Sequence, residues 1–125
     1  MVAVMEEPEP VRRVDRYLAT ARIAQEAIWE LHNRLVAAGK YDEHARQQLH
    51  EAARIVAVEM PTILRRAVEL RARWSDEELL DTGAAESTAT ELAVELDRVQ
   101  PALERLRERQ NAVAREFGGL LNRPP

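Results

Sequence analysis

Apolar residues recur along the chain with the spacing of long amphipathic helices. Between positions 92 and 120 the spacing alternates between four and three residues, at Leu92, Leu96, Val99, Leu103, Leu106, Gln110, Val113, Phe117 and Leu120. A mean spacing of three and a half residues places these side chains on one seam of a helix, and such a seam is buried against other helices. The sequence therefore predicts an all-α protein with lengthwise helix packing.

A first helix is expected over residues 11–38. One of its faces carries Val14, Tyr17, Ala21, Ala24, Ile28, Leu31, Leu35 and Ala38. Gly39 follows at the position where a left-handed residue commonly ends a helix. Asp42 is a suitable N-cap for the next helix. So short a connection makes the first two helices antiparallel neighbours.

The second helix is expected over residues 43–74, with Pro61 inside it. A proline in a helix interior either ends the helix or bends it. The apolar seam continues past Pro61, with one added residue between Val56 and Met60, so the same face stays buried on both sides. We therefore predict one bent helix.

Two capping-box patterns follow the second helix. Ser75 and Glu78 form the first pattern, and Thr88 and Glu91 form the second. In a capping box each side chain satisfies a free backbone donor of the other residue at the start of a helix. The patterns predict a short connecting helix over about 76–81, stopped by Thr82 and Gly83, and a last helix over 88–117, ended by Gly118 and Gly119.

These elements predict an antiparallel up-down-up bundle of three long helices with a short connecting helix. One domain covers residues 11–121, because a chain of 125 residues suits a single core. Residues 1–10, rich in glutamate and proline, are expected to be a disordered lead-in, and residues 122–125 a frayed tail.

Composition narrows the class of protein. The chain contains 46% hydrophobic and 32% charged residues, has a net charge of −4 and lacks cysteine. Thiolate metal sites and disulfides are therefore excluded, and a reducing, cytoplasmic location is expected. No signal peptide and no apolar run long enough to span a bilayer is present, so no membrane partner is expected. The negative charge argues weakly against non-specific binding to nucleic acid.

The first helix has more apolar side chains than its seam needs. Trp29 and Val36 share a line one step around the helix, flanked by Leu18 and His32. A stripe this wide needs more cover than one neighbouring helix gives. The cover is either internal, from Leu79 and Leu80 or from Leu120 and Leu121, or external, with Trp29 anchoring a protein interface.

Arginines gather at one end of the predicted bundle. Antiparallel packing brings together Arg12, Arg13, Arg16, Arg65, Arg66, Arg71 and Arg73. The connector crossing this end carries Asp76, Glu77, Glu78, Asp81, Glu86 and Glu91. One possibility is that these charges neutralise one another as surface ion pairs. The other is that the acidic connector is a lid over an anion or nucleic-acid site made by the arginines, since guanidinium groups suit phosphate geometry.

Gln110 occupies a seam position where leucine would be expected. One polar residue in such a seam often selects helix register or oligomeric state. Alternatively, Gln110 sits at a solvated end of the bundle. We favour register selection.

No residue pattern indicates catalysis or a cofactor. The three histidines, His32, His44 and His50, lack the helical spacing of a bundle metal site, although the hairpin places His32 level with Leu49 and His50. There is no Gly-rich phosphate loop, and no small-molecule substrate is indicated. The sequence thus favours a non-enzymatic helical module that binds a protein partner or itself. The alternative is a helical subunit or regulator that contacts nucleic acid through its arginine-rich end.

Overall fold

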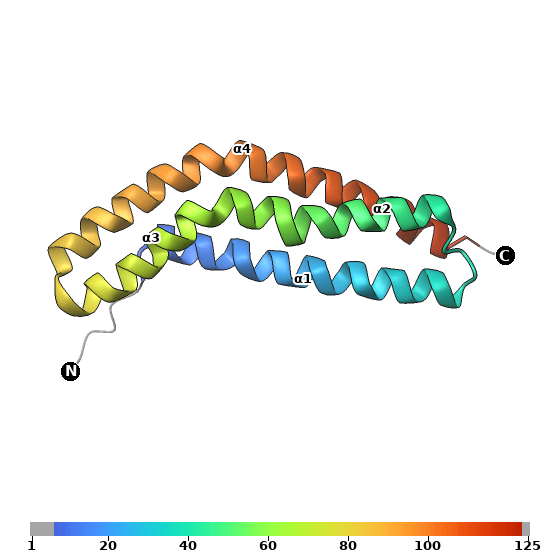
Figure 1. Cartoon of the computed structure of the whole chain (residues 1–125), viewed down its shortest axis with the longest axis horizontal. Coiled ribbons are helices and arrows are strands. Elements are labelled where there is room, and N and C mark those ends of the chain that lie inside the picture. Colours follow the sequence, from blue (N-terminus) through green and yellow to red (C-terminus); the bar gives the residue numbers. More distant parts are fainter. Residues whose placement is uncertain (1–6, 124–125) are drawn as a thin grey trace.

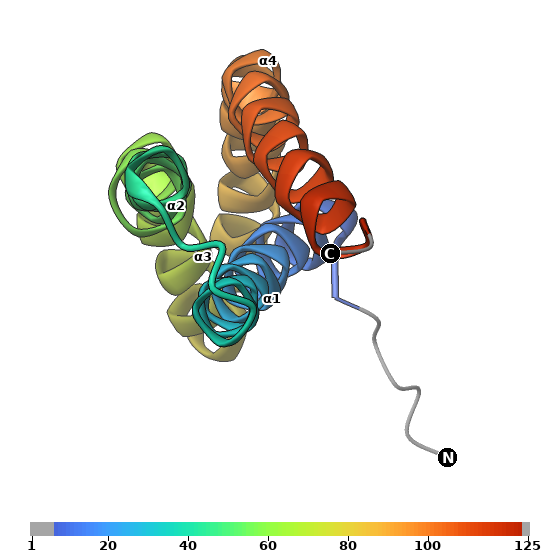
Figure 2. The same ribbon diagram turned by 90° about the vertical axis from the view of Figure 1, so that its right-hand side faces the viewer.

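A computed structural model describes residues 7–123, and within them the chain is an all-α bundle (Figure 1). Its elements are α1 (Glu9–Ala37), α2 (Glu43–Arg54), the π-helical turn η1 (Ile55–Glu59), α3 (Met60–Leu80) and α4 (Thr82–Leu121). Because α2, η1 and α3 join into one helical rod, three rods lie side by side. Seen end-on, α1, α2 and α4 stand at the corners of a triangle (Figure 2). The predicted up-down-up bundle is confirmed.

The α1–α2 connection forms as its residues predict. Gly39 has a positive φ of 67°, a conformation that glycine adopts without strain. The Asp42 carboxylate accepts a hydrogen bond from the Ala45 amide over 2.8 Å, so Asp42 is the N-cap of α2. At its other end α1 begins at Glu9, two residues before the expected start, because Pro10 suits a first turn, where amides have no helical partner. Of the rest of the predicted lead-in, residues 7 and 8 precede the helix and residues 1–6 lie outside the described residues.

Pro61 bends the second rod without ending it, as predicted. The extra residue in the seam is accommodated by η1, where the Met60 amide donates to the carbonyl of Ile55, five residues earlier. In a regular helix the proline ring would collide with the carbonyl four residues before it. The wider π-turn relieves this collision while both sides keep the same buried face.

The connecting helix and the start of the last helix are predicted wrongly. α3 continues through Ser75 to Leu80, and α4 begins at Thr82, so one sharp turn at Asp81 replaces the expected short helix over 76–81. Neither capping box forms. The Ser75 hydroxyl instead contacts Arg71, and the Thr88 hydroxyl donates to the Glu77 carboxylate over 2.6 Å. Asp81 is the actual N-cap of α4, because its carboxylate accepts from the amides of Gly83 and Ala84.

The last helix also runs further than expected. Gly118 and Gly119 are helical, and α4 ends at Leu121. Packing explains the extension, because Leu120 and Leu121 rest against a buried cluster and the Lys40 ammonium donates to the Leu120 carbonyl over 2.9 Å. The cation satisfies a carbonyl that has no partner within the helix. Residues 124 and 125 of the predicted tail lie outside the described part of the chain.

The core divides into two clusters along the bundle. The larger cluster includes Trp74, Leu92 and Leu96 near the α3–α4 turn, and the smaller one includes Leu35, Leu49 and Phe117 near the α1–α2 loop. Between Val14 and Leu35, α1 contributes no fully buried residue. In that interval Tyr17, Ala21, Ala24 and Ile28 pack against the larger cluster and stay only partly buried.

Candidate functional site

A broad groove separates the middle of α1 from α2. Its volume is about 710 Å³. One wall is formed by α1, the other by α2, and Tyr41 of the connecting loop closes one end; the lining residues are Arg22, Gln25, Glu26, Ile28, Trp29, His32, Tyr41, Arg46, Leu49, His50 and Ala53. Its size and mixed apolar and polar lining suit the docking of a side-chain row from another helix.

Aromatic rings form the end of this groove nearest the loop. The indole of Trp29 stacks on the imidazole of His32, with ring centroids 5.2 Å apart and planes 8° from parallel. The His32 and Tyr41 rings pack in a T-shaped pair, with centroids 4.7 Å apart and planes at 77°. These contacts hold Trp29 in place, yet 65% of it remains exposed. The structure therefore presents a fixed indole face to the groove.

The four candidate interaction residues are only partly brought together. Trp29 and His32 touch, whereas Leu18 and Val36 lie further along α1, both exposed. Internal cover by Leu79 and Leu80 is ruled out, because α3 carries both outward at the hairpin, 85% and 86% exposed. Leu120 and Leu121 pack on the smaller cluster beside Leu31 and Leu35. Neither pair of leucines covers Trp29.

Some charged groups around the groove form ion pairs and others do not. Arg46 donates to the Glu43 carboxylate over 2.6 and 2.9 Å, which lowers the pKa of Glu43. Arg22 and Glu26, in contrast, form no ion pair or hydrogen bond with any side chain of residues 7–123. The α1 wall thus carries one positive and one negative side chain that form no ion pair within residues 7–123.

Sequence reasoning singled out Trp29 and His32 of the α1 wall, and it missed the polar part of that wall and most of the α2 wall. Tyr41, Arg46 and Ala53 gave no individual signal, because each is ordinary for a loop or a helix surface. The hairpin geometry did place His32 level with Leu49 and His50, and all three line the groove. Extending that level-by-level matching around α2 would have found the remaining wall.

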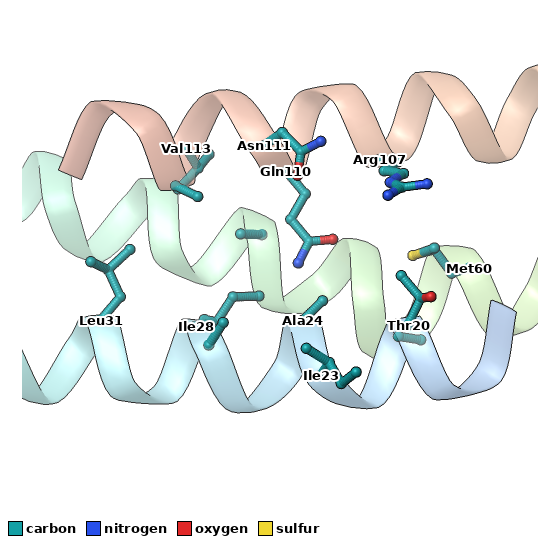
Figure 3. Close-up of a pocket in the computed structure, with 14 residues that line it drawn as sticks. Thr20, Ile23, Ala24, Ile28, Leu31, Met60, Arg107, Gln110, Asn111 and Val113 are labelled. Carbon is teal, nitrogen blue, oxygen red and sulfur yellow. The ribbon is translucent and has the colours of Figure 1, made fainter. Parts of the chain in front are cut away.

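A second, smaller cleft lies between α1 and α4, and Gln110 projects into it (Figure 3). Its volume is about 230 Å³, and Ala24, Ile28 and Val113 are among its lining residues. Gln110 is half-buried and forms no hydrogen bond with a described residue. It lies between the two core clusters and away from the bundle ends. Its effect on register or oligomeric state stays a prediction.

The predicted arginine-rich end exists, and carboxylates occupy much of it. Arg13 pairs with Asp97 over 2.9 Å, Arg71 with Asp15 over 3.1 Å, and Arg16 with Glu9 over 3.4 Å. The hydrogen bond to Asp15 is the main cause that raises the pKa of Arg71. Two of these acids, Asp15 and Glu9, belong to α1 itself. From the sequence, only acids of the connector are expected to neutralise the arginines.

The connector region supplies the remaining pairs. Arg73 contacts Glu91 over 2.6 Å and Glu77 over 3.4 Å, and Arg66 lies 3.9 Å from Glu91. Arg12 and Arg65 are exposed on α1 and α3. Because most of these pairs lie at the surface, each contributes less than about 1 kcal/mol to stability, but together they reduce the positive charge available to an anion.

Residues 7–123 contain neither a candidate metal site nor a candidate membrane span. This part of the chain has no group of three or more His, Asp or Glu side chains placed to hold a metal ion. None of its helices is both long and apolar enough to cross a membrane. Comparison of the chain with protein-family models, curated protein sequences and solved structures finds no match.

Proposed function

We propose that this protein is a non-enzymatic helical assembly module that self-associates by docking a helix into the α1–α2 groove. One observation carries the proposal: Trp29 forms part of the groove wall with 65% of its surface exposed. Tryptophan is a frequent energetic centre of protein interfaces. An indole held by stacking on His32 loses little freedom when a partner covers it.

The sparse burial of α1 supports the same proposal. A helix of 29 residues normally buries one continuous stripe, whereas between Val14 and Leu35 the stripe of α1 is only partly buried against the core. A helix docked in the groove would instead cover the neighbouring row of α1 that contains Arg22, Trp29 and His32. The alternative function, nucleic-acid contact through the arginine-rich end, has less support, because its arginines at positions 13, 16, 66, 71 and 73 form ion pairs with carboxylates.

Light scattering on wild-type protein and two matched variants tests the proposal. Trp29→Ala removes the proposed anchor, and Ile23→Ala removes an equally exposed apolar side chain (66%) that lines the other cleft of α1. Wild type and Ile23→Ala should have a mass above the 14.2 kDa of one chain. Trp29→Ala should lose at least about 2 kcal/mol of association energy and move towards monomer. A wild-type monomer, or equal masses for both variants, would contradict the proposal.

A further inference from the structure

We infer that the occupant of the α1–α2 groove is the α1 helix of a second copy, running antiparallel to the first. This inference rests on the proposed function and specifies its partner and geometry. It depends on a row of α1 residues that face the groove or continue its line along the helix.

That row has the spacing of a packing seam. It comprises Leu18, Arg22, Gln25, Trp29, His32 and Val36, so that its steps are four, three, four, three and four residues. Such spacing is the geometry of two helices that pack along their length. The middle four residues line the groove, and the two end residues, Leu18 and Val36, are exposed and apolar.

The spacing of this row is symmetric about Ala27. Two antiparallel copies paired about this point place Leu18 opposite Val36, Gln25 opposite Trp29, and Arg22 opposite His32. Each apolar end therefore meets an apolar end, and each indole meets an amide that can accept its N–H. A twofold axis makes both halves of the interface identical, as in most homodimers.

Charge favours the antiparallel direction over the parallel one. A parallel pair in register would place Arg22 against Arg22 and Glu30 against Glu30. In the antiparallel pair, Arg22 lies within two residues, or about 3 Å along the axis, of Glu30 in the other copy. Neither residue has an ion-pair partner within residues 7–123. Pairing of opposite charges between the copies therefore replaces repulsion of like charges.

The absence of cysteine from the chain allows a direct test of this geometry. Leu18→Cys and Val36→Cys are made as separate chains, one carrying a mass tag, and treated with a bis-maleimide of about 10 Å, the interaxial distance of packed helices. Val94→Cys, exposed on α4, measures the background from random collision. Intact mass spectrometry then counts the covalent dimers.

The inference predicts cross-linking between Leu18→Cys and Val36→Cys chains when they are mixed, and none above the Val94→Cys background for either chain alone. Self-linking of Leu18→Cys chains would show a parallel pair and overturn the inference, while leaving self-association intact. No linking in the mixture, from protein that light scattering shows to be dimeric, would also overturn it. A monomeric wild type would instead be a failure of the proposed function itself.

Discussion

The Thr88 hydroxyl donates a hydrogen bond to a carboxylate oxygen of Glu77 over 2.6 Å and so ties α4 to α3 beside their shared turn. Thr88 is the only polar side chain that is buried within residues 7–123, at 3% exposure. The Glu77 carboxylate also lies 3.4 Å from the Arg73 guanidinium. A buried hydroxyl, a carboxylate and an arginine thus fix the angle of the hairpin.

Removing the hydroxyl while keeping the shape should weaken the hairpin. Thr88→Val leaves the partly buried Glu77 carboxylate without this donor, and we expect a loss of about 1–3 kcal/mol in the free energy of unfolding. Thr88→Ser keeps the donor and should lose less. Urea unfolding measures the difference in free energy between the variants, and an unchanged m-value shows that only stability has changed. Equal losses for both variants would assign the effect to packing.

The π-turn and Pro61 should depend on one another. Deleting Val58 removes the extra residue and restores regular helical spacing on the buried face, but it leaves Pro61 inside a regular helix, at a cost of about 3 kcal/mol. The same deletion combined with Pro61→Ala should recover most of that stability. Thermal unfolding of the two proteins, with Pro61→Ala alone as the control, tests this. A deletion that costs nothing by itself would count against the account of η1.

Leu79 and Leu80 should contribute little to stability. Both are outward at the hairpin, so replacing the two with serine should change the free energy of unfolding by less than about 1 kcal/mol. Leu92→Ala, at a fully buried position, should cost about 2–5 kcal/mol. Chemical denaturation compares them. A large loss from the serine pair would mean that these leucines are covered within the folded chain.

The pH dependence of stability should include a contribution from Glu95. Arg98 donates to this carboxylate over 2.6 and 2.9 Å, and these hydrogen bonds are the main cause that lowers the pKa of Glu95. Because the folded pKa lies below the unfolded value of about 4.3, the stabilisation is present at neutral pH and lost as pH falls through the folded pKa. Glu95→Gln should therefore have a lower Tm at neutral pH and a smaller fall in Tm on acidification than wild type. The Tm of both proteins is measured as the pH is lowered. A difference in Tm that stays constant over this range would argue against the contribution.

Periodicity predicted the rods, their directions and the bend at Pro61, because burying a stripe constrains every turn of a long helix. Local capping patterns failed at Ser75 and Thr88, since a serine or threonine followed by glutamate also occurs inside helices. There, packing of Trp74 and Thr88 stabilises continuous helix more than a cap would. Asp81, a good N-cap followed by Thr82 and Gly83, was the better local signal for the turn.

The candidate groove could be predicted only in part. The surplus of apolar residues on α1 pointed to Trp29, because such a surplus can be recognised from the sequence of a single helix. The α2 wall depends on how far apart α1 and α2 pack, and no local pattern determines that distance. Exposed Ile23 was missed for the same reason, since the cleft that it lines with Gln110 depends on how α1 and α4 pack.

Fluorescence of Trp29 tests the central claim most directly. Trp74→Phe leaves Trp29 as the only tryptophan, and circular dichroism checks that this core variant keeps its fold. If self-association covers the groove, the emission should move from the red-shifted position of a solvated indole towards the blue as protein concentration rises, in parallel with the mass from light scattering. An emission that stays red-shifted while the mass doubles would contradict docking at Trp29.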